Sequence, residues 1–276
     1  MNKYSQNQWL KGIVVTLIIL TLTMTAVPAF ASDSSCFSWY CVRTKDHTRP
    51  RADAMLSWIE EAQYHAIYRD PQCNDQPTPE NRVLYLTFDV GYENGNVGKV
   101  LDVLKEKDVP GAFFVLSHVF EAESALIARI QKEGHLLCNH TAHHKDMAKI
   151  QDHDTFVREL TELESICMEK TGQSISKFYR PPEGKFTKEQ LLWASELGYQ
   201  TVLWSFAYAD WDNERQPSHS EAIEKITANL HNGAILLLHP TSSTNAAILG
   251  EVIDYCREQG YRFEALSNIC LGENNA

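Results

Sequence analysis

Three side chains of this sequence could carry out hydrolysis with the help of a metal ion. Asp89 follows an apolar run, and a carboxylate at the end of a strand can be tuned as a general base. His140 and His144 are four residues apart, so a helix or tight turn would point both imidazoles the same way, toward zinc or a similar divalent ion. Val90 stands where a second carboxylate would complete the ligand set.

An arginine could support the carboxylate of Asp89. Arg180 opens the segment Arg-Pro-Pro-Glu-Gly, 180–184, which follows another apolar run. Two prolines stiffen the backbone, so the loop could hold the guanidinium against a buried carboxylate and aim a backbone N–H at a developing oxyanion.

Two polar residues that follow later apolar runs could supply a general acid. His239 ends the apolar run 235–238, and the pKa of a histidine lies near neutrality. Asp210 could orient that imidazole, and the neighbouring Trp211 could form the wall of a sugar pocket. Leu237 is two residues before His239 and would point to the same side of a strand, lining an apolar pocket.

Each of these residues also has a purely structural interpretation. Asp89 could cap the turn at Gly91, and the two imidazoles could belong to a histidine-rich surface turn. Arg180 could be a solvated loop residue, Asp210 a loop acid, and His239 a structural histidine. The common position of these residues after apolar runs favours the functional interpretation.

Seven short apolar runs alternate with segments of helical periodicity from residue 83 onward, which predicts strands that alternate with helices. The expected strands are 83–88, 111–115, 136–138, 177–179, 201–204, 234–238 and 261–263. The expected helices are 97–106, 124–133, 154–170 with Asp154 as N-cap, 188–197, 220–230 and 245–259. This pattern predicts an α/β barrel of parallel strands, whose chemistry lies at their carboxyl ends.

Residues 32–80 are less regular, and we expect them to form a leader that packs on the main domain, 81–276. Residues 54–68 carry a rough apolar stripe of Met55, Ile59, Ala62 and Ile67, which predicts one helix. Prolines after residue 70 then break the pattern.

The seven cysteines are odd in number and lack the Cys-x-x-Cys spacing of a metal site. Cys36 and Cys41 are close enough to form a small disulfide loop, or they remain free. Cys138 and Cys167 fall in a predicted strand and a predicted helix, where they would be buried apolar residues.

Residues 1–31 have the composition of a secretory signal peptide. Lys3 and Lys11 precede or flank an uncharged, mostly apolar run, and Ala29-Phe30-Ala31 has the form that signal peptidases cleave. We therefore expect secretion to the cell wall, with an uncleaved membrane anchor as the alternative. The net charge of −11, near −13 without the two lysines, argues against nucleic acid and anionic lipid as partners and favours a glycan. A monomer is the default expectation.

In their order, these motifs resemble those of the polysaccharide deacetylases with the NodB homology domain, carbohydrate esterase family 4. The resemblance spans about residues 82–269. It rests on Thr87-Phe88-Asp89, His140-Thr141-Ala142-His143-His144, Arg180-Pro181-Pro182, Asp210-Trp211 and Leu237-Leu238-His239. The residues 91–95 and 204–211, with Ser38-Trp39-Tyr40 upstream, are similar to the PdaA-like branch. That branch deacetylates N-acetylmuramic acid in peptidoglycan, on the way to the muramic δ-lactam of the spore cortex.

The resemblance implies a distorted (β/α)7 barrel of the NodB type and a set of catalytic roles. Asp89 would be the base that activates water, and Arg180 would hold and tune it. His239 would protonate the leaving amine, with Asp210 orienting it. Such an acid and base could serve the proton transfers of amide hydrolysis.

The resemblance also implies a substrate-binding set and a metal site. Leu237 and Trp211 would shape the slot for the acetyl methyl group, the backbone N–H of Glu183 would help to bind the oxyanion, and Tyr92 would contact the glycan. His140 and His144 would bind the metal ion.

The departure from the family pattern is Val90, because the wider family has a metal-binding aspartate there. Two imidazoles and waters would make a weaker site, which Glu93 could complete unless it faces solvent. Three functions therefore stay open. The protein could be a secreted deacetylase of N-acetylmuramic acid in peptidoglycan strands, a deacetylase of N-acetylglucosamine polymers or acetylated glycans, or a metal-free glycan-binding pseudoenzyme.

Overall fold

The computed structural model describes residues 35–44 and 46–269. The predicted signal peptide, residues 1–31, lies outside this part of the chain. Within it, no helix combines the length and the apolar character that crossing a membrane requires.

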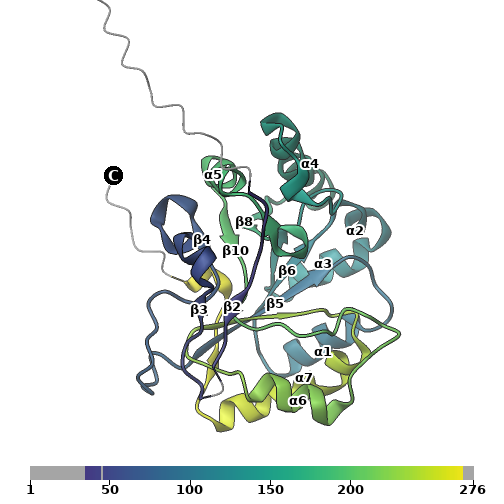
Figure 1. Cartoon of the computed structure of the whole chain (residues 1–276). Helices are drawn as coiled ribbons and strands as arrows, with labels where there is room; N and C mark the ends of the chain where they lie inside the picture. Colours follow the sequence, from purple (N-terminus) through teal and green to yellow (C-terminus); the bar gives the residue numbers. More distant parts are fainter. Residues whose placement is uncertain (1–34, 45, 270–276) are drawn as a thin grey trace, which may run out of the picture. The chain divides into compact units, whose positions relative to one another are not determined.

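A parallel sheet of eight strands forms the centre of the fold (Figure 1). Its order is β11-β5-β6-β7-β8-β10-β4, and β12 pairs with the start of β5. The strands are β4 (Ala66–Ile67), β5 (Val83–Val90), β6 (Gly111–Val115), β7 (Leu136–Asn139), β8 (Ser176–Tyr179), β10 (Gln200–Val202), β11 (Ala234–Leu238) and β12 (Arg262–Phe263). Bridges from Arg69 to Ala234 and from Phe206 to Leu236 join the far end of this order to β11, so the sheet curls into the predicted distorted barrel.

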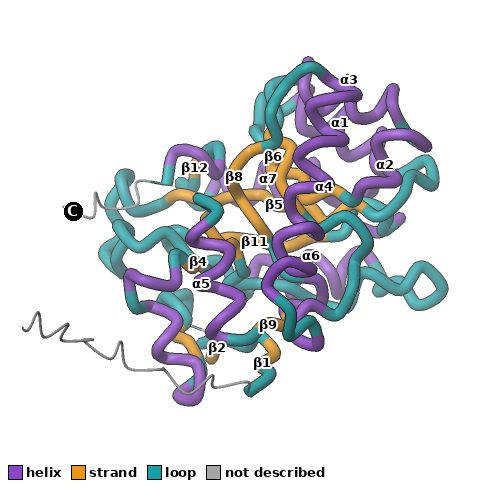
Figure 2. Tube along the Cα trace, turned by 90° about the horizontal axis from the view of Figure 1, so that it is seen from above, coloured by secondary structure: helices purple, strands orange, loops and turns teal. Residues whose placement is uncertain are grey.

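Helices surround the strands, as Figure 2 shows. They are α1 (Val97–Glu106), α2 (Ser117–Ala122), α3 (Ser124–Lys132), α4 (His153–Thr171), α5 (Lys188–Glu196), α6 (His219–Thr227) and α7 (Ser243–Glu258). The prediction of Asp154 as N-cap is wrong, because α4 begins earlier and the side chain of Asp152 accepts the backbone N–H of Thr155.

The alternation of side chains along β5 decides which of its residues reach the site. Leu86, Phe88 and Val90 belong to the apolar core that contains residues of α1, α3 and α7. Thr87 and Asp89 point to the opposite face, where both contact the guanidinium of Arg180. The side chain of Val90 is fully buried among these core residues and therefore faces the helix layer.

Residues 35–80 contribute a strand to the sheet as well as packing on it. The predicted single helix over 54–68 is wrong, because the chain forms two 3-10 helices, η1 (Ala54–Glu60) and η2 (Ala62–Tyr64). His65 has a φ of 42°, a left-handed conformation that ends the helical stretch, and β4 then pairs with β10. Met55, expected on the apolar stripe, is 76% exposed.

Short strands tie the beginning of the described chain to the barrel. Strand β1 (Phe37–Ser38) pairs with β9 (Lys185–Phe186), and β2 (Cys41–Val42) pairs with β3 (Arg51–Ala52). The remaining 3-10 helices are η3 (Met147–Lys149), η4 (Pro182–Gly184) and η5 (Leu266–Asn268).

The cysteines of the described residues are all free, so Cys36 and Cys41 form no disulfide loop. Cys138 lies in β7 and Cys167 in α4, and both are buried, as the sequence predicts.

Candidate active site

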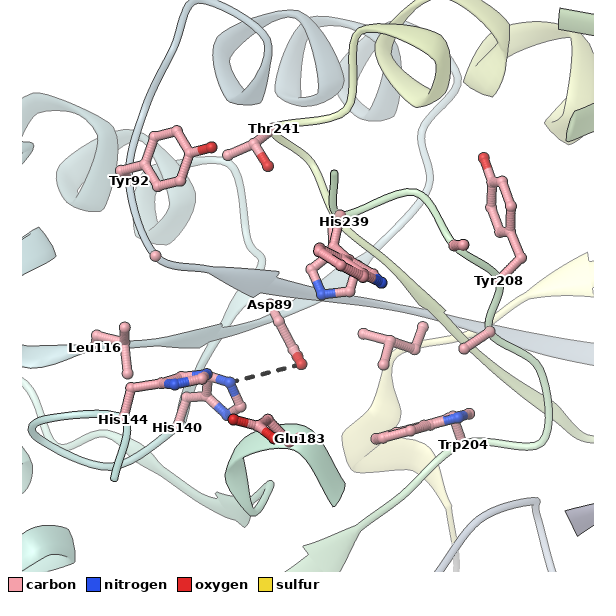
Figure 3. A pocket seen from close by; sticks show the side chains of 15 residues that line it. Asp89, Tyr92, Leu116, His140, His144, Glu183, Trp204, Tyr208, His239 and Thr241 are labelled. Carbon is pink, nitrogen blue, oxygen red and sulfur yellow. Dashed lines mark ion pairs between the residues drawn. The ribbon is translucent and has the colours of Figure 1, made fainter. Parts of the chain in front are cut away.

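A cavity of about 800 Å³ lies where several strands end (Figure 3). Most of the predicted site residues line it: Asp89, Tyr92, His140, His144, Glu183, Trp211, Leu237 and His239. The two other predicted residues, Arg180 and Asp210, are fully buried and contact Asp89 and His239 from behind. The barrel thus brings all ten together, although Asp89 and His239 are 150 positions apart in the sequence.

Asp89 is held by Arg180. Oδ1 of Asp89 accepts a hydrogen bond from Nη1 of Arg180 at 2.7 Å, and Oδ2 lies 3.7 Å from Nε2 of His140. Burial would raise the pKa of Asp89, but the positive charge of Arg180, with a smaller contribution from His239, outweighs it and lowers the pKa. Asp89 is therefore ionised and available to accept a proton.

The guanidinium of Arg180 is fixed on every side. Its Nε donates to the carbonyl of Val202 at 3.0 Å, and its Nη2 donates to Oγ1 of Thr87 at 2.8 Å. Its charged carbon stands 4.1 Å from the ring centroid of Phe114. A buried charge needs such a complete set of partners, and the result is a rigid support for Asp89.

His140 presents one ring nitrogen to the cavity. Its Nδ1 is 2.9 Å from the carbonyl oxygen of Arg180, an acceptor, so Nδ1 carries the proton and Nε2 keeps its lone pair. Burial lowers the pKa of His140 to about 4, which keeps the ring neutral at neutral pH. A neutral imidazole binds metal ions through one ring nitrogen while the other nitrogen donates a hydrogen bond, here to a backbone carbonyl.

His144 stands beside His140 in a turn, with the ring centroids 5.0 Å apart (Figure 3). The turn is held by the hydroxyl of Thr141, which accepts the backbone N–H of His144. His143 of the same motif has a different environment, because its Nδ1 lies 3.1 Å from Oε1 of Glu159 in α4. Of the three histidines in this motif, His140 and His144 therefore line the cavity, whereas His143 contacts α4.

His239 and Asp210 form a second acid–base pair at the end of β11. Oδ1 of Asp210 accepts Nδ1–H of His239 at 2.7 Å, and Oδ2 accepts the backbone N–H of the same histidine at 2.8 Å. Burial would lower the pKa of His239, but the hydrogen bond and the charge of Asp210 raise it. His239 therefore keeps its second proton, on Nε2, to a higher pH than an unperturbed imidazole does.

Sequence reasoning missed the residue that holds Asp210. Nδ2 of Asn245, in the first turn of α7, donates to Oδ2 of Asp210 at 2.6 Å and to the carbonyl of His239 at 3.1 Å. Nothing in the local sequence marks Asn245, because it lies in an ordinary helix start. The cavity residues Leu116 and Thr241 were also missed, and their positions after strands are the only signal that could have found them. Trp204 and Tyr208, which line the cavity too, belong to the segment 204–211 that carries the family resemblance.

The walls of the cavity are mainly apolar and aromatic. Leu237 is buried at its base, whereas Trp211 is 64% exposed and Tyr92 49% exposed, so these two form the rim. The hydroxyl of Tyr92 is hydrogen-bonded to Asn213, which joins two loops of the rim. Glu183 has a φ of 56°, in the left-handed region, and lies in the loop opposite.

The residues of the site fit a divalent ion only in part. The lone pair on Nε2 of His140 and the adjacent ring of His144 suit such an ion. Among the described residues, however, no group of three or more His, Cys, Asp or Glu is arranged to hold one. Val90 faces the core, and the carboxylate of Glu93 accepts backbone N–H groups of Gly95 and Gly98 at the start of α1, so it cannot serve as the third ligand in this arrangement.

Comparison with known proteins defines the family. The sequence profile of the polysaccharide deacetylases matches residues 76–202. The peptidoglycan-N-acetylmuramic acid deacetylase PdaA of Bacillus subtilis is 34% identical over 262 residues, which cover 95% of each chain. This chain therefore belongs to the polysaccharide deacetylase family.

Solved structures and a further relative agree with this assignment. The structure of Bacillus subtilis PdaA, a family 4 carbohydrate esterase, matches with a TM-score of 0.78 and 36% identity, covering 86% of this chain and 97% of the other. A peptidoglycan-N-acetylglucosamine deacetylase of Bacillus cereus is 31% identical, over 78% of this chain and 74% of its own.

Proposed function

We propose that this protein is a secreted hydrolase that removes the acetyl group from N-acetylmuramic acid in peptidoglycan strands, in the muramic δ-lactam pathway of the spore cortex. The observation that carries the proposal is that Asp89, held by Arg180, and His239, held by Asp210, line one cavity. The similarity to PdaA over nearly the whole chain supports the choice of sugar.

The reaction needs two proton transfers. Asp89, whose pKa is lowered, takes a proton from water as the water oxygen attacks the amide carbon. His239, whose pKa is raised, then gives its Nε2 proton to the amide nitrogen while the carbon–nitrogen bond breaks. Acetate and the free amine of the sugar leave the cavity.

The remaining residues orient the acetamido group. The buried side chain of Leu237 offers an apolar contact for the acetyl methyl group, and the rim residues Trp211 and Tyr92 offer ring faces to the sugar. The backbone N–H of Glu183 would donate to the oxyanion that forms on the carbonyl oxygen.

A divalent ion would be held by His140 and His144. When bound, such an ion lowers the pKa of a bound water and polarises the carbonyl group. The hydrogen bond from His140 to the carbonyl of Arg180 sets the tautomer that this binding requires.

Acetate release from two glycans tests the choice of substrate. We expect the purified protein, supplied with divalent metal, to release acetate from muramoyl glycan strands that lack stem peptides, and to do so faster than from chitooligosaccharides. Mass spectrometry would locate the lost acetyl group on the muramic residue. Faster release from chitooligosaccharides would instead favour the N-acetylglucosamine alternative, which the Bacillus cereus relative motivates.

The pseudoenzyme alternative is motivated by Val90 and by the missing third ligand. It predicts that glycan binds without turnover under any metal, and that binding is the same in Asp89→Asn. Against it, a binding protein has no use for a buried arginine that lowers the pKa of Asp89 or for an acid that raises the pKa of His239.

A further inference from the structure

The chain just before the barrel touches two of the loops that line the cavity. One is the loop with Glu183, which precedes β9, and the other is the segment 204–207, which follows β10. Strand β1 pairs with β9 in antiparallel register, which aligns Phe37 with Phe186. Cys41 and Arg43 then contact the second segment, through the carbonyls of Ser205 at 3.4 Å and Ala207 at 3.2 Å.

Trp39 connects both loops by itself. Its backbone N–H donates to the carbonyl of Gly184 at 2.8 Å, and its indole Nε1–H donates to the carbonyl of Trp204 at 2.8 Å. The ring is 8% exposed and packs against Tyr68, with centroids 4.8 Å apart. One buried residue, through its backbone and its side chain, thus joins two segments that are 20 residues apart in sequence.

The contact at Gly184 leaves no free space. A Cβ atom on Gly184 would lie 2.8 Å from the ring of Trp204 and 3.1 Å from Cβ of Trp39. Gly184 also has a φ of 64°, which favours glycine. The loop with Glu183 is therefore pressed between the cavity wall on one side and Trp39 on the other.

We propose that Trp39 is a positioning residue for the active site, which sets the backbone of Glu183 and Gly184 against the wall formed by Trp204. The inference rests on the proposed function, in which the N–H of Glu183 donates to the oxyanion. Such a donor acts only if it is held in place before the reaction, and small displacements reduce the rate. Trp39 would act through this loop without touching the substrate.

Trp39→Phe tests the role because it keeps an aromatic ring against Tyr68 and removes the indole N–H, together with the five-membered ring that carries it. We expect kcat for acetate release to fall roughly 3- to 10-fold, the effect of one hydrogen bond, while KM changes less than about twofold. Trp58→Phe is the matched control, since it removes the bond from another indole to the carbonyl of Met55, in the same apolar cluster but away from the cavity. A kcat of Trp39→Phe equal to that of the parent protein, or equal decreases of kcat in Trp39→Phe and Trp58→Phe, would overturn the proposal.

Amide hydrogen exchange gives a readout that does not depend on activity. We expect faster exchange in peptides covering 181–186 and 203–208 of Trp39→Phe. In Trp58→Phe, whose ring packs on Phe186, exchange in 203–208 should stay unchanged. Arg43→Ala, an exposed change that the fold should tolerate, is expected to affect 203–208 only. If the parent releases no acetate, the proposed function fails, and the exchange data still decide whether Trp39 holds the loops. Unchanged exchange in Trp39→Phe would overturn that role.

Discussion

Both carboxylate oxygens of Asp210 bind the same residue, His239, one through the ring at 2.7 Å and one through the backbone at 2.8 Å. The ring of His239 therefore cannot turn without breaking a bond to a fully buried acid. Because the side chain of Asn245 donates to Asp210 in turn, the orientation of the proposed general acid is set by α7 as well as by β11.

Asp210→Asn should move the alkaline limb of the pH–activity profile. The charge of Asp210 raises the pKa of His239, so the variant should lose its protonated acid at lower pH than the parent does. We expect kcat at pH 8 to fall at least about tenfold. Asp254→Asn, at an exposed acid of α7, should leave the profile unchanged. An alkaline limb at the same pH in parent and variant would show that His239 is not the group that titrates.

The same pair should make stability depend on pH. A histidine whose pKa is raised by folding stabilises the protein fully below its unfolded pKa, and this contribution is lost as the pH rises through the folded value. Urea denaturation should therefore show a larger destabilisation by Asp210→Asn at pH 5.5 than at pH 9. The reverse order would contradict the direction of the shift.

Arg180→Lys should destabilise the fold and impair activity together. An ammonium cannot reproduce the hydrogen bonds from Arg180 to Asp89, Thr87 and Val202. We expect the free energy of unfolding to fall by about 3 kcal/mol, as for a broken buried ion pair. Urea denaturation measures this loss. Arg158→Lys, at an exposed position of α4, should change it by less than about 0.5 kcal/mol, and equal effects would mean that Arg180 has no special role.

Zinc affinity should differ among variants of the three histidines in the motif 140–144. His140→Ala and His144→Ala should each weaken zinc binding at least about tenfold, since each removes one of the two proposed ligands. His143→Ala should bind zinc as the parent does, because His143 contacts Glu159 instead of facing the cavity. Isothermal titration calorimetry of the three variants would measure this, and equal affinities in all three would exclude the site.

Val90→Ala should affect stability and leave the chemistry unchanged. The side chain of Val90 is fully buried in the core with Phe88 and Leu86, so its truncation should lower the free energy of unfolding by about 2 kcal/mol. Zinc affinity and acetate release per folded molecule should match the parent. A loss of zinc affinity would show that position 90 supports the ligands after all.

The sequence predicted the parts of the fold that have long, regular signals. Strand β5 is largely apolar and carries Asp89 next to its last residue, and β11 is a continuous apolar run that His239 follows, so these two residues could be placed together in advance. Strand β4 could not be predicted, because two residues after a left-handed His65 carry no periodic pattern.

The environment of the site depends on contacts between distant residues. The sequence around Asn245 does not predict its hydrogen bond to Asp210, and the sequence around Trp39 does not predict its hydrogen bond to Trp204. Both bonds exist only once the barrel has formed. The orientation of the Val90 side chain could have been predicted, because successive side chains of a strand point to opposite faces and Asp89 is its neighbour.

Acetate release by Asp89→Asn and His239→Gln, compared with the parent on muramoyl glycan strands without stem peptides, tests most directly whether this cavity is the active site. With divalent metal present, we expect the parent to release acetate and each variant to be slower by at least about 100-fold, while glycan binding stays the same. Release by both variants at the parent rate would contradict the assignment and place the chemistry elsewhere.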